Sequence, residues 1–368
     1  MAKFKGAMEK MVNKRKILVT GNCGYIGPVI AKHFKKVHPN YSLIGFDNGY
    51  FSHCLTNSSY NPIFDYDFQY WGDIRNFPEK ILDNVDSVIH LAAISNDPMG
   101  KKYENVTKDI NFISSLKLAN LAKSKGIKSF VFSSSCSIYG YAEEEEKTED
   151  SSLNPLTQYA KSKVEMEEAL FKISDLNFNV TALRFATACG MSDRLRLDLV
   201  LNDFVASAIA ERKISILSDG SPWRPLINVK DMSRAISWAL NRDKLLGNFI
   251  AVNTGSKEWN YQVSDLAKAV ADEIPNIEIK INPDAAPDKR SYRVNFEKFT
   301  NLAPDNKPIT TLSETIKDLK AGLEKMNFNN KNFREDSGYM RLNTLEELKK
   351  LDLIDKKLNW SRKFKFQG

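Results

Sequence analysis

The feature that most constrains the fold of this chain is a set of three glycines between a short apolar run and a helical pattern. Residues 16–20 are apolar and rich in β-branched side chains, which is typical of a buried strand. Apolar spacing over 25–37 predicts a helix. Between them stand Gly21, Gly24 and Gly27. Glycines allow a tight turn and close backbone approach, and a helix N-terminus offers free N–H groups. The turn therefore predicts a site for the pyrophosphate of a dinucleotide.

A carboxylate follows the second expected strand, at residues 43–46. Asp47 lies about 20 residues beyond the last glycine of the turn, where dinucleotide-binding folds place an acidic residue. There it can accept hydrogen bonds from the adenosine ribose hydroxyls, and it would repel a 2′-phosphate. The two features together favour NAD over NADP. Asn48, the next residue, is assigned to the same site.

Strands and helices alternate along the first half of the chain. Further apolar, strand-like runs lie at 87–91, 130–132 and 179–183, with helical patterns at 102–125 and 156–174 between them. Strands that alternate with helices build βαβ units, and uninterrupted apolar strands suit a sheet covered on both faces. The prediction is an α/β fold with a Rossmann doubly wound parallel sheet.

Beyond about residue 190 the elements become shorter, which predicts a smaller C-terminal α/β substrate lobe. Its expected helices lie near 197–211, 230–241 and 262–272, and its expected strands near 214–217, 249–253 and 277–281. The predicted domains are an NAD-binding Rossmann domain at 15–190, to which some later segments return, a substrate lobe at 191–326 and a C-terminal extension at 327–368. The extension has one short helical pattern near 343–353 and Trp360, and we expect it to dock on the body or on a neighbouring subunit. No chemistry is visible in it.

Composition argues against several classes of function. The 368 residues contain no apolar run of the roughly 18 residues that cross a membrane, and the N-terminus lacks the features of a signal peptide. We therefore expect a cytoplasmic protein. The four cysteines and four histidines are scattered, so neither a metal site nor a disulfide framework is expected. The net charge of +7 is concentrated at the chain ends, and the body lacks the basic, aromatic-lined face that nucleic acid requires.

A tyrosine, a lysine and a serine from a run of three form a candidate catalytic group. Tyr159 and Lys163 occupy positions i and i+4 of an expected helix and share a face, and Ser133–Ser135 end the strand before it. Oxidation of a carbinol needs a base for the hydroxyl proton as hydride leaves. A free tyrosine, with a pKa of about 10, is too weak a base at neutral pH. A lysine ammonium and a positive nicotinamide ring favour the phenolate, and a serine hydroxyl can hold the substrate oxygen.

These residues, with Ile138-Tyr139-Gly140 after the serines, resemble the extended short-chain dehydrogenase/reductase family, in its sugar-nucleotide epimerase/dehydratase branch. The similarity covers roughly residues 15–325. It implies that Ser135 supplies the catalytic hydroxyl, that Asp73-Ile74 flanks the adenine and that Asn111 supports the cofactor site. It also implies NAD as cofactor, held by Gly21, Gly24, Tyr25, Ile26, Gly27, Asp47, Asn48, Asp73, Ile74, Leu91, Ala92, Ala93, Ser133, Tyr159, Lys163 and Phe185.

The residues after Ser135 narrow the range of reactions that the chain can be expected to catalyse. In sugar-nucleotide 4,6-dehydratases an acidic pair typically follows the catalytic hydroxyl, whereas Cys136 and Ser137 stand here, so dehydration is disfavoured. The leading interpretation is an NAD-dependent sugar-nucleotide epimerase that acts through a transient 4-keto sugar, with Tyr159 as base. A 4-dehydrogenase or 4-ketoreductase for nucleotide-linked sugars is the alternative, and the motifs do not separate the two. A non-catalytic NAD-binding regulator is disfavoured because Tyr159 and Lys163 are both present.

The resemblance also implies contacts to a nucleotide-sugar substrate. Arginine suits a diphosphate because its guanidinium is planar and permanently charged. Thr187 stands where the family usually has asparagine. With Arg194–Asp198, this is similar to a subgroup acting on unusual cell-surface sugars, including bacterial heptose nucleotides, and it weakens assignment as an ordinary UDP-galactose 4-epimerase. The sugar and the nucleotide stay open. The family also implies a homodimer through the helices at 102–125 and 156–174. The expected substrate-binding residues are Ser95, Thr187, Arg196, Asn202, Arg224 and Arg290.

Overall fold

The computed structural model describes residues 14–57, 59–141, 146–282 and 291–361. At its centre lies a seven-stranded sheet in the order β10-β6-β5-β4-β1-β2-β3, with every neighbouring pair parallel. The chain winds outward from β1 in both directions, which confirms the predicted Rossmann topology. The strands are β1 (Arg15–Thr20), β2 (Tyr41–Asp47), β3 (Phe68–Trp71), β4 (Ser87–His90), β5 (Ser129–Ser135), β6 (Asn179–Phe185) and β10 (Phe249–Thr254).

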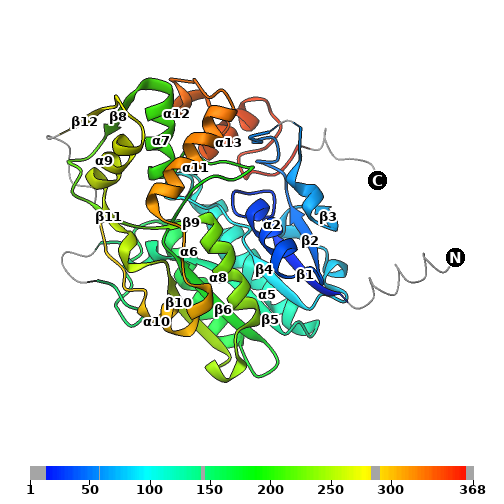
Figure 1. Cartoon of the computed structure of the whole chain (residues 1–368). Helices are drawn as coiled ribbons and strands as arrows, with labels where there is room; N and C mark the ends of the chain where they lie inside the picture. The colour runs from blue at the N-terminus through cyan, green and yellow to red at the C-terminus, as the bar shows by residue number, and fades with distance from the viewer. Residues whose placement is uncertain (1–13, 58, 142–145, 283–290, 362–368) are drawn as a thin grey trace, which may run out of the picture.

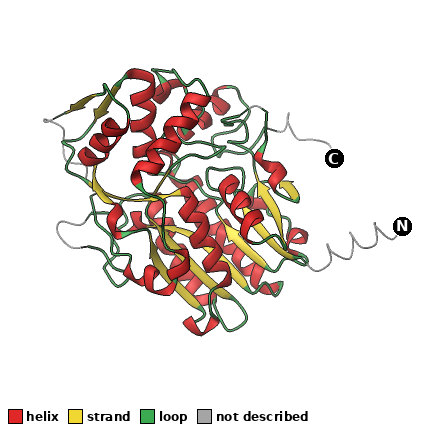
Figure 2. Ribbon diagram, in the orientation of Figure 1, coloured by secondary structure: helices red, strands yellow, loops and turns green. Residues whose placement is uncertain are grey.

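Helices cover both faces of this sheet (Figure 2). Ile17 and Val19 of β1 pack in one apolar cluster with α2 and α8, and Leu18 between them packs in the other with α5 and α6. This alternation is what a strand buried on both faces requires. The expected helix at 102–125 is a succession of shorter pieces that includes a π-helical segment. The elements are α2 (Gly27–Val37), α3 (Asp97–Lys102), α4 (Glu104–Lys108), η4 (Asp109–Ser114), α5 (Ser115–Ser124), α6 (Gln158–Ile173) and α8 (Val229–Asn241).

Two elements expected in the smaller lobe lie in the Rossmann domain instead. β10 is an edge strand of the central sheet, paired with β6 from Phe249 opposite Val180 to Thr254 opposite Phe185. α8 packs on the same sheet, against β5 and β6. Apolar spacing shows that a segment has a buried face, but not which sheet covers it. These are later segments that return to the first domain.

The smaller lobe lies beyond one end of the sheet, with α7, α9 and α11 as its main helices (Figure 1). Its strands form a three-stranded sheet, β11-β9-β7, and the pair β12-β8. The elements of the lobe are β7 (Thr187–Cys189), α7 (Val200–Glu211), β8 (Lys213–Ile216), β9 (Trp223–Asn228), β11 (Asn260–Gln262), α9 (Val263–Glu273), β12 (Glu278–Ile281) and α11 (Leu312–Lys325). α10 (Glu297–Leu302) packs instead against β10 at the edge of the central sheet. Short 3₁₀ helices are η1 (Pro62–Asp65), η2 (Ile74–Asn76), η3 (Glu79–Leu82), η5 (Cys136–Tyr139), η6 (Lys244–Leu246), η7 (Lys257–Trp259) and η8 (Pro304–Asn306).

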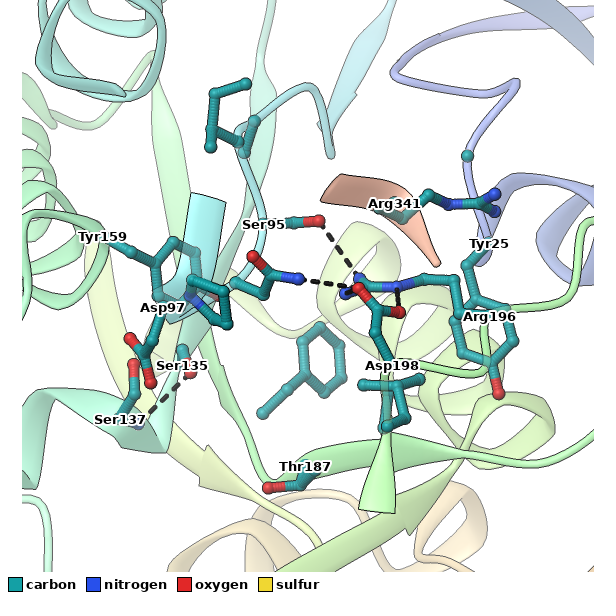
Figure 3. Close-up of a pocket in the computed structure, with 18 of the residues that line it drawn as sticks. Tyr25, Ser95, Asp97, Ser135, Ser137, Tyr159, Thr187, Arg196, Asp198 and Arg341 are labelled. Carbon is teal, nitrogen blue, oxygen red and sulfur yellow. Dashed lines mark hydrogen bonds and ion pairs between the residues drawn. The ribbon is translucent and has the colours of Figure 1, made fainter. Parts of the chain in front are cut away.

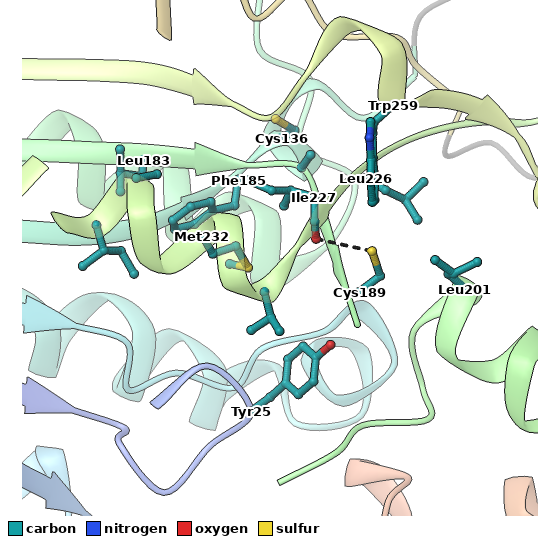
Figure 4. Close-up of a cluster of buried hydrophobic side chains, with 14 of the residues drawn as sticks. Tyr25, Cys136, Leu183, Phe185, Cys189, Leu201, Leu226, Ile227, Met232 and Trp259 are labelled. Atoms are coloured by element: carbon teal, nitrogen blue, oxygen red, sulfur yellow. Dashed lines mark hydrogen bonds between the residues drawn. The ribbon is translucent and has the colours of Figure 1, made fainter. Parts of the chain in front are cut away.

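The hydrophobic core continues from the sheet into the smaller lobe (Figure 4). Phe185 at the end of β6, Ile227 on β9 and Leu201 on α7 belong to one buried cluster. The Cys189 thiol, also buried there, donates to the Ile227 carbonyl oxygen at 3.4 Å. This shared core fixes the lobe relative to the carboxyl ends of the strands.

The C-terminal extension packs on the body of its own chain. It contains α12 (Phe333–Asp336), which an ion pair between Arg334 and Asp203 joins to α7, and α13 (Arg341–Lys350), whose Arg341 lies over the Phe51 ring. Leu345 and Leu358 are fully buried in the apolar cluster on the α5 and α6 side of the sheet. The extension is thus an integral layer of the fold.

Within the described ranges, no helix has the length and apolarity to cross a membrane. The same residues contain no group of three His, Cys, Asp or Glu side chains placed to hold a metal ion.

Candidate active site

The carboxyl ends of the central strands open into a cavity of about 760 Å³ between the Rossmann domain and the smaller lobe. Open α/β sheets bind ligands at this edge, where the direction of winding changes. Most residues predicted for the cofactor, the reaction and the substrate meet in this cavity. They are Gly21, Gly24, Tyr25, Ile26, Asp47, Asn48, Asp73, Ile74, Leu91, Ala92, Ala93, Ser95, Ser133, Ser135, Tyr159, Lys163, Phe185, Thr187, Arg196 and Arg224.

The turn after β1 requires glycine at two positions. A Cβ on Gly21, whose φ is +73°, would lie 2.7 Å from the backbone nitrogen of Ala92. A Cβ on Gly27 would lie 2.0 Å from the carbonyl oxygen of Asn22, so Gly27 packs against the turn and does not line the cavity. α2 starts at Gly27, and its N-cap residue, Ile26, provides no side-chain hydrogen bond to the free N–H groups of the first turn. Its N-terminus can therefore receive an anionic group from the cavity.

Asp47 ends β2 with its carboxylate at the cavity wall. Oδ2 accepts from the backbone N–H of Cys23 at 3.0 Å, and Oδ1 accepts from that of Gly49 at 2.7 Å. Burial raises the pKa of this carboxyl group, and the two backbone bonds oppose the rise. Each oxygen keeps a second lone pair, which suits the two hydroxyls of a ribose.

Figure 3 shows Tyr159 and Ser135 together at one side of the cavity. Lys163, one turn along α6, donates from Nζ to the Ser133 carbonyl oxygen at 2.6 Å and stands 5.5 Å from the centre of the Tyr159 ring. Burial raises the pKa of Tyr159 to about 12, while a hydrogen bond with the Ser135 side chain lowers it. Burial also lowers the pKa of Lys163 to about 7, against the effect of Glu167. Formation of the phenolate therefore needs further positive charge beside the ring.

The low pKa of Lys163 predicts a pH dependence of stability in protein freed of cofactor. The ordinary lysine pKa is 10.5, and the folded value is about 7. Between these values the unfolded chain binds more protons than the folded chain, so the free energy of unfolding rises with pH, by roughly 1 kcal/mol per pH unit. Above about pH 10 the unfolded tyrosine begins to lose its proton and opposes the rise. Lys163→Met should therefore lack the rise between about pH 7 and pH 10.

Urea denaturation of the cofactor-free protein across that range measures the effect as the difference between wild type and variant. Lys161→Met is the matched control, because it removes an exposed lysine from the same helix. The control should follow the wild-type profile. Parallel profiles for wild type and Lys163→Met would contradict the assigned shift.

A buried ion pair fixes α6 to the sheet beneath the catalytic group. Glu167 accepts from Arg184 Nη2 at 2.8 Å and Nε at 3.0 Å, and from the Ser134 hydroxyl. Arg184 Nη1 also donates to the Tyr139 hydroxyl at 3.0 Å. The side chains of Arg184 and Glu167 are only 8% and 6% exposed. The pair therefore ties α6 to β5 and β6 close to the predicted catalytic side chains.

A second buried ion pair forms another part of the cavity wall. Arg196 donates from Nε and Nη2 to Asp198 at 2.9 Å and 3.0 Å, and from Nη1 to the Ser95 hydroxyl at 3.1 Å (Figure 3). Asn96 Nδ2 donates to Asp198 at 2.7 Å. Burial favours a raised pKa for Asp198, but Arg196 outweighs it and holds the pKa below its usual value. Both members of the pair are therefore charged.

Other predicted residues lie outside the cavity lining. Asn202 is fully buried, and its amide accepts from the Gly190 N–H at 2.9 Å and donates to the Arg196 carbonyl oxygen at 2.8 Å. It thus fixes the chain behind Arg196. Asn111 accepts from the Ile94 N–H at 2.8 Å and supports the segment after β4. Arg290 falls outside the described residues.

The sequence did not single out several polar side chains that line the cavity. Asp97 accepts from the Thr157 hydroxyl at 2.6 Å, and its charge raises the pKa of Tyr159. Asp97 follows β4 closely, at the edge of the sheet where ligands bind, and this position could have predicted it as a site residue. The arginines of the extension gave no such signal, because their position depends on where the extension docks. The polar side chains not singled out include Asn96, Asp97, Arg334 and Arg341.

Comparison with known proteins agrees with this geometry. Residues 17–255 match the model of the NAD dependent epimerase/dehydratase family. A UDP-glucose 4-epimerase from Lactobacillus helveticus is 28% identical over 276 residues, covering 69% of this chain and 81% of the relative. A UDP-glucose 4-epimerase structure from Stenotrophomonas maltophila, with bound NAD and formylated UDP-arabinopyranose, has a TM-score of 0.73 at 20% identity and covers 85% of this chain and 99% of that one. An NAD-dependent NDP-hexosamine 5,6-dehydratase involved in tunicamycin biosynthesis has a TM-score of 0.72 at 22% identity, covering 87% and 100%.

Because the family match spans more than half of the chain, this protein belongs to the NAD-dependent epimerase/dehydratase family. The resemblance drawn from the glycine turn and the catalytic group is confirmed. Its cofactor is NAD, and the cavity fits NAD on two observations: an uncapped helix start for the pyrophosphate and a fixed carboxylate, Asp47, for the ribose. Bound NAD supplies the nicotinamide ring that takes up and returns a hydride.

Proposed function

We propose that this chain is an NAD-dependent sugar-nucleotide epimerase that acts through a transient 4-keto sugar. The observation that carries the proposal is the meeting of Tyr159, Ser135 and Lys163 in a cavity shared by the Rossmann domain and the smaller lobe. Thr187 and Arg224 line the same cavity from the lobe. The lobe side therefore offers the nucleotide sugar a place beside the dinucleotide.

In this proposal Tyr159 is the base that takes the proton of the sugar hydroxyl and later returns it. Ser135 holds the sugar oxygen by a hydrogen bond, and Lys163 beside the tyrosine favours the phenolate. The Lys163 ammonium keeps its place through the bond to the Ser133 carbonyl oxygen. An epimerase requires the keto sugar to turn within the cavity and present its other face, so the substrate residues must bind the nucleotide more firmly than the sugar.

A set of nucleotide sugars tests the proposal: UDP-glucose, UDP-N-acetylglucosamine and an ADP-heptose, incubated with protein as purified. Proton NMR is expected to show a change of configuration in one of them, with unchanged mass and no reduced cofactor in solution. Release of a keto sugar with free NADH would instead identify a 4-dehydrogenase. A product lighter by one water would identify a dehydratase, for which Asp97, facing the Tyr159 region, is the available carboxyl group.

A homodimer through the helices at 102–125, which comprise α4, η4 and α5, and at 156–174, which contain α6, stays a prediction. η4 and α6 expose apolar side chains, with Ile113 54% and Phe171 65% accessible. Burial of such groups in a helix-helix interface is favourable. Light scattering of the full chain is expected to give the mass of a dimer, and Phe171→Glu should shift it toward the monomer. A monomeric wild-type protein at micromolar concentration would contradict this prediction.

A further inference from the structure

The C-terminal extension crosses the molecule from the smaller lobe to the end of β2. At its start, Arg334 forms an ion pair with Asp203 of α7 at 2.7 Å. In the middle, the Tyr339 carbonyl oxygen accepts from the Leu197 N–H at 3.0 Å. At its end, Trp360 Nε1 donates to the Asn48 carbonyl oxygen at 2.7 Å. The extension is therefore attached at both sides of the cavity.

The last part of the extension holds the two segments assigned to adenosine. The Leu358 carbonyl oxygen accepts from the Tyr50 hydroxyl and from Arg75 Nη2, the latter at 3.0 Å. Arg75 also donates to Asp73, with Nε at 2.9 Å and Nη2 at 2.6 Å. The segments that follow β2 and β3 are thus joined through the extension.

The extension brings Arg334, Met340 and Arg341 to the cavity lining, and Arg341 stands at the start of α13. Its side chain is buried, with 2% of the residue exposed. Nη2 donates to the Arg194 carbonyl oxygen at 3.0 Å, and the guanidinium lies 4.7 Å from the centre of the Phe51 ring. Nη1 has no hydrogen-bond partner among the described residues. A buried cationic donor without a partner is costly unless a ligand satisfies it.

The charges around Arg341 favour binding of a negatively charged ligand beside it. Burial lowers the pKa of Arg341 most; among the neighbouring charges, Cys54 raises it, whereas Arg196 and Arg194 lower it further. Asp198 opposes them, but its two oxygens are already bonded to Arg196 and Asn96. A ligand with negative charge would offset the excess of buried positive charge.

The position of Arg341 in the cavity indicates which anionic group it would bind. Its charge acts on Asp47, the carboxylate at the ribose end of the cofactor site. Figure 3 places Arg341 well away from Tyr159 and Ser135, where the sugar reacts. The uncapped start of α2, which can receive a pyrophosphate, meets the same cavity at Gly24, Tyr25 and Ile26. We propose that Arg341 binds the diphosphate group of NAD, so that the C-terminal extension completes the cofactor site.

The test compares Arg341→Met with the wild type after bound NAD has been removed. Methionine keeps an unbranched apolar side chain and removes the guanidinium, with its charge, its bond to the Arg194 carbonyl oxygen and its contact with the Phe51 ring. NAD affinity, measured by calorimetry, is expected to fall about 10- to 100-fold, as for loss of a hydrogen bond to a charged group. ADP-ribose, which keeps the diphosphate, should weaken equally, and adenosine should not. Lys350→Met removes an exposed charge from the same helix and should bind NAD like the wild type.

The melting temperature of the cofactor-free protein separates binding from a structural role. If Arg341 serves a ligand, its replacement removes an uncompensated buried charge, so the melting temperature should stay the same or rise. A lower melting temperature with unchanged NAD affinity would overturn the proposal. So would full NAD retention combined with weaker binding of UDP-glucose, because the diphosphate would then be that of the substrate. If Arg341→Met fails to fold, Arg341→Lys should bind NAD with intermediate affinity, and wild-type affinity would overturn the proposal. None of these measurements requires turnover, so their outcome is independent of the reaction proposed above.

Discussion

Replacing Tyr159 by phenylalanine is expected to leave NAD bound and to reduce turnover by about 10²- to 10⁴-fold, the usual contribution of a general acid–base. The change removes one hydroxyl and keeps the ring that packs beside Lys163. Residues of the glycine turn and Asp47 stay in place, since neither contacts the Tyr159 hydroxyl in the described hydrogen bonds. The loss should therefore appear in kcat, with little change in the amount of NAD that copurifies.

The measurement combines a turnover assay on the active nucleotide sugar with absorbance of the NAD released on denaturation. Tyr70→Phe is the matched control, because Tyr70 is an exposed tyrosine on β3. That variant should turn over like the wild type. Wild-type turnover in Tyr159→Phe would remove tyrosine from the mechanism and leave the proposed function without its base.

The parts of the site that were predictable are those fixed by local backbone needs and by the order of strands. Gly21 must be glycine because its φ is +73° and a Cβ would meet the Ala92 nitrogen. Asp47 follows a strand whose end lies at the ligand edge in every sheet of this topology. Tyr159 and Lys163 share a helix face at i, i+4 spacing. Each of these relations can be recognised within a short stretch of sequence.

The site residues and element positions that the sequence did not predict depend on long-range packing. Arg341 reaches the cavity only because α13 docks over Phe51, nearly 300 positions earlier in the chain. β10 and α8 have apolar faces that fit either lobe. The pairing of β10 with β6 and the packing of α8 on β5 and β6 decide their place. Asn202, predicted to contact the substrate, lies behind the cavity wall, where its amide bonds to backbone groups of Gly190 and Arg196. Spacing along the chain does not reveal such three-dimensional neighbours.

Replacing Glu167 by glutamine is expected to lower the free energy of unfolding by about 3–5 kcal/mol. Glutamine has nearly the same volume, so the loss does not come from a cavity. It comes from Arg184, whose side chain is only 8% exposed and which would be left as a buried cation without its counter-charge. The remaining partners of Arg184, the Tyr139 hydroxyl and the Glu149 carbonyl oxygen, are neutral and cannot replace a carboxylate.

Urea denaturation of wild type and variant, both loaded with NAD, measures this difference. Asp318→Asn is the control: its ion pair with Lys230 is exposed, with side chains 43% and 54% accessible, and its loss should cost less than about 1 kcal/mol. The double variant Glu167→Leu with Arg184→Met should recover much of the lost stability, because a buried ion pair can be replaced by apolar groups of similar volume. Since Glu167 follows Lys163 by one turn of α6, the same double variant also tests the role of the pair in catalysis. Restored stability with reduced kcat would mean that the ion pair positions the reacting side chains, whereas restored stability with wild-type kcat would limit it to holding the fold.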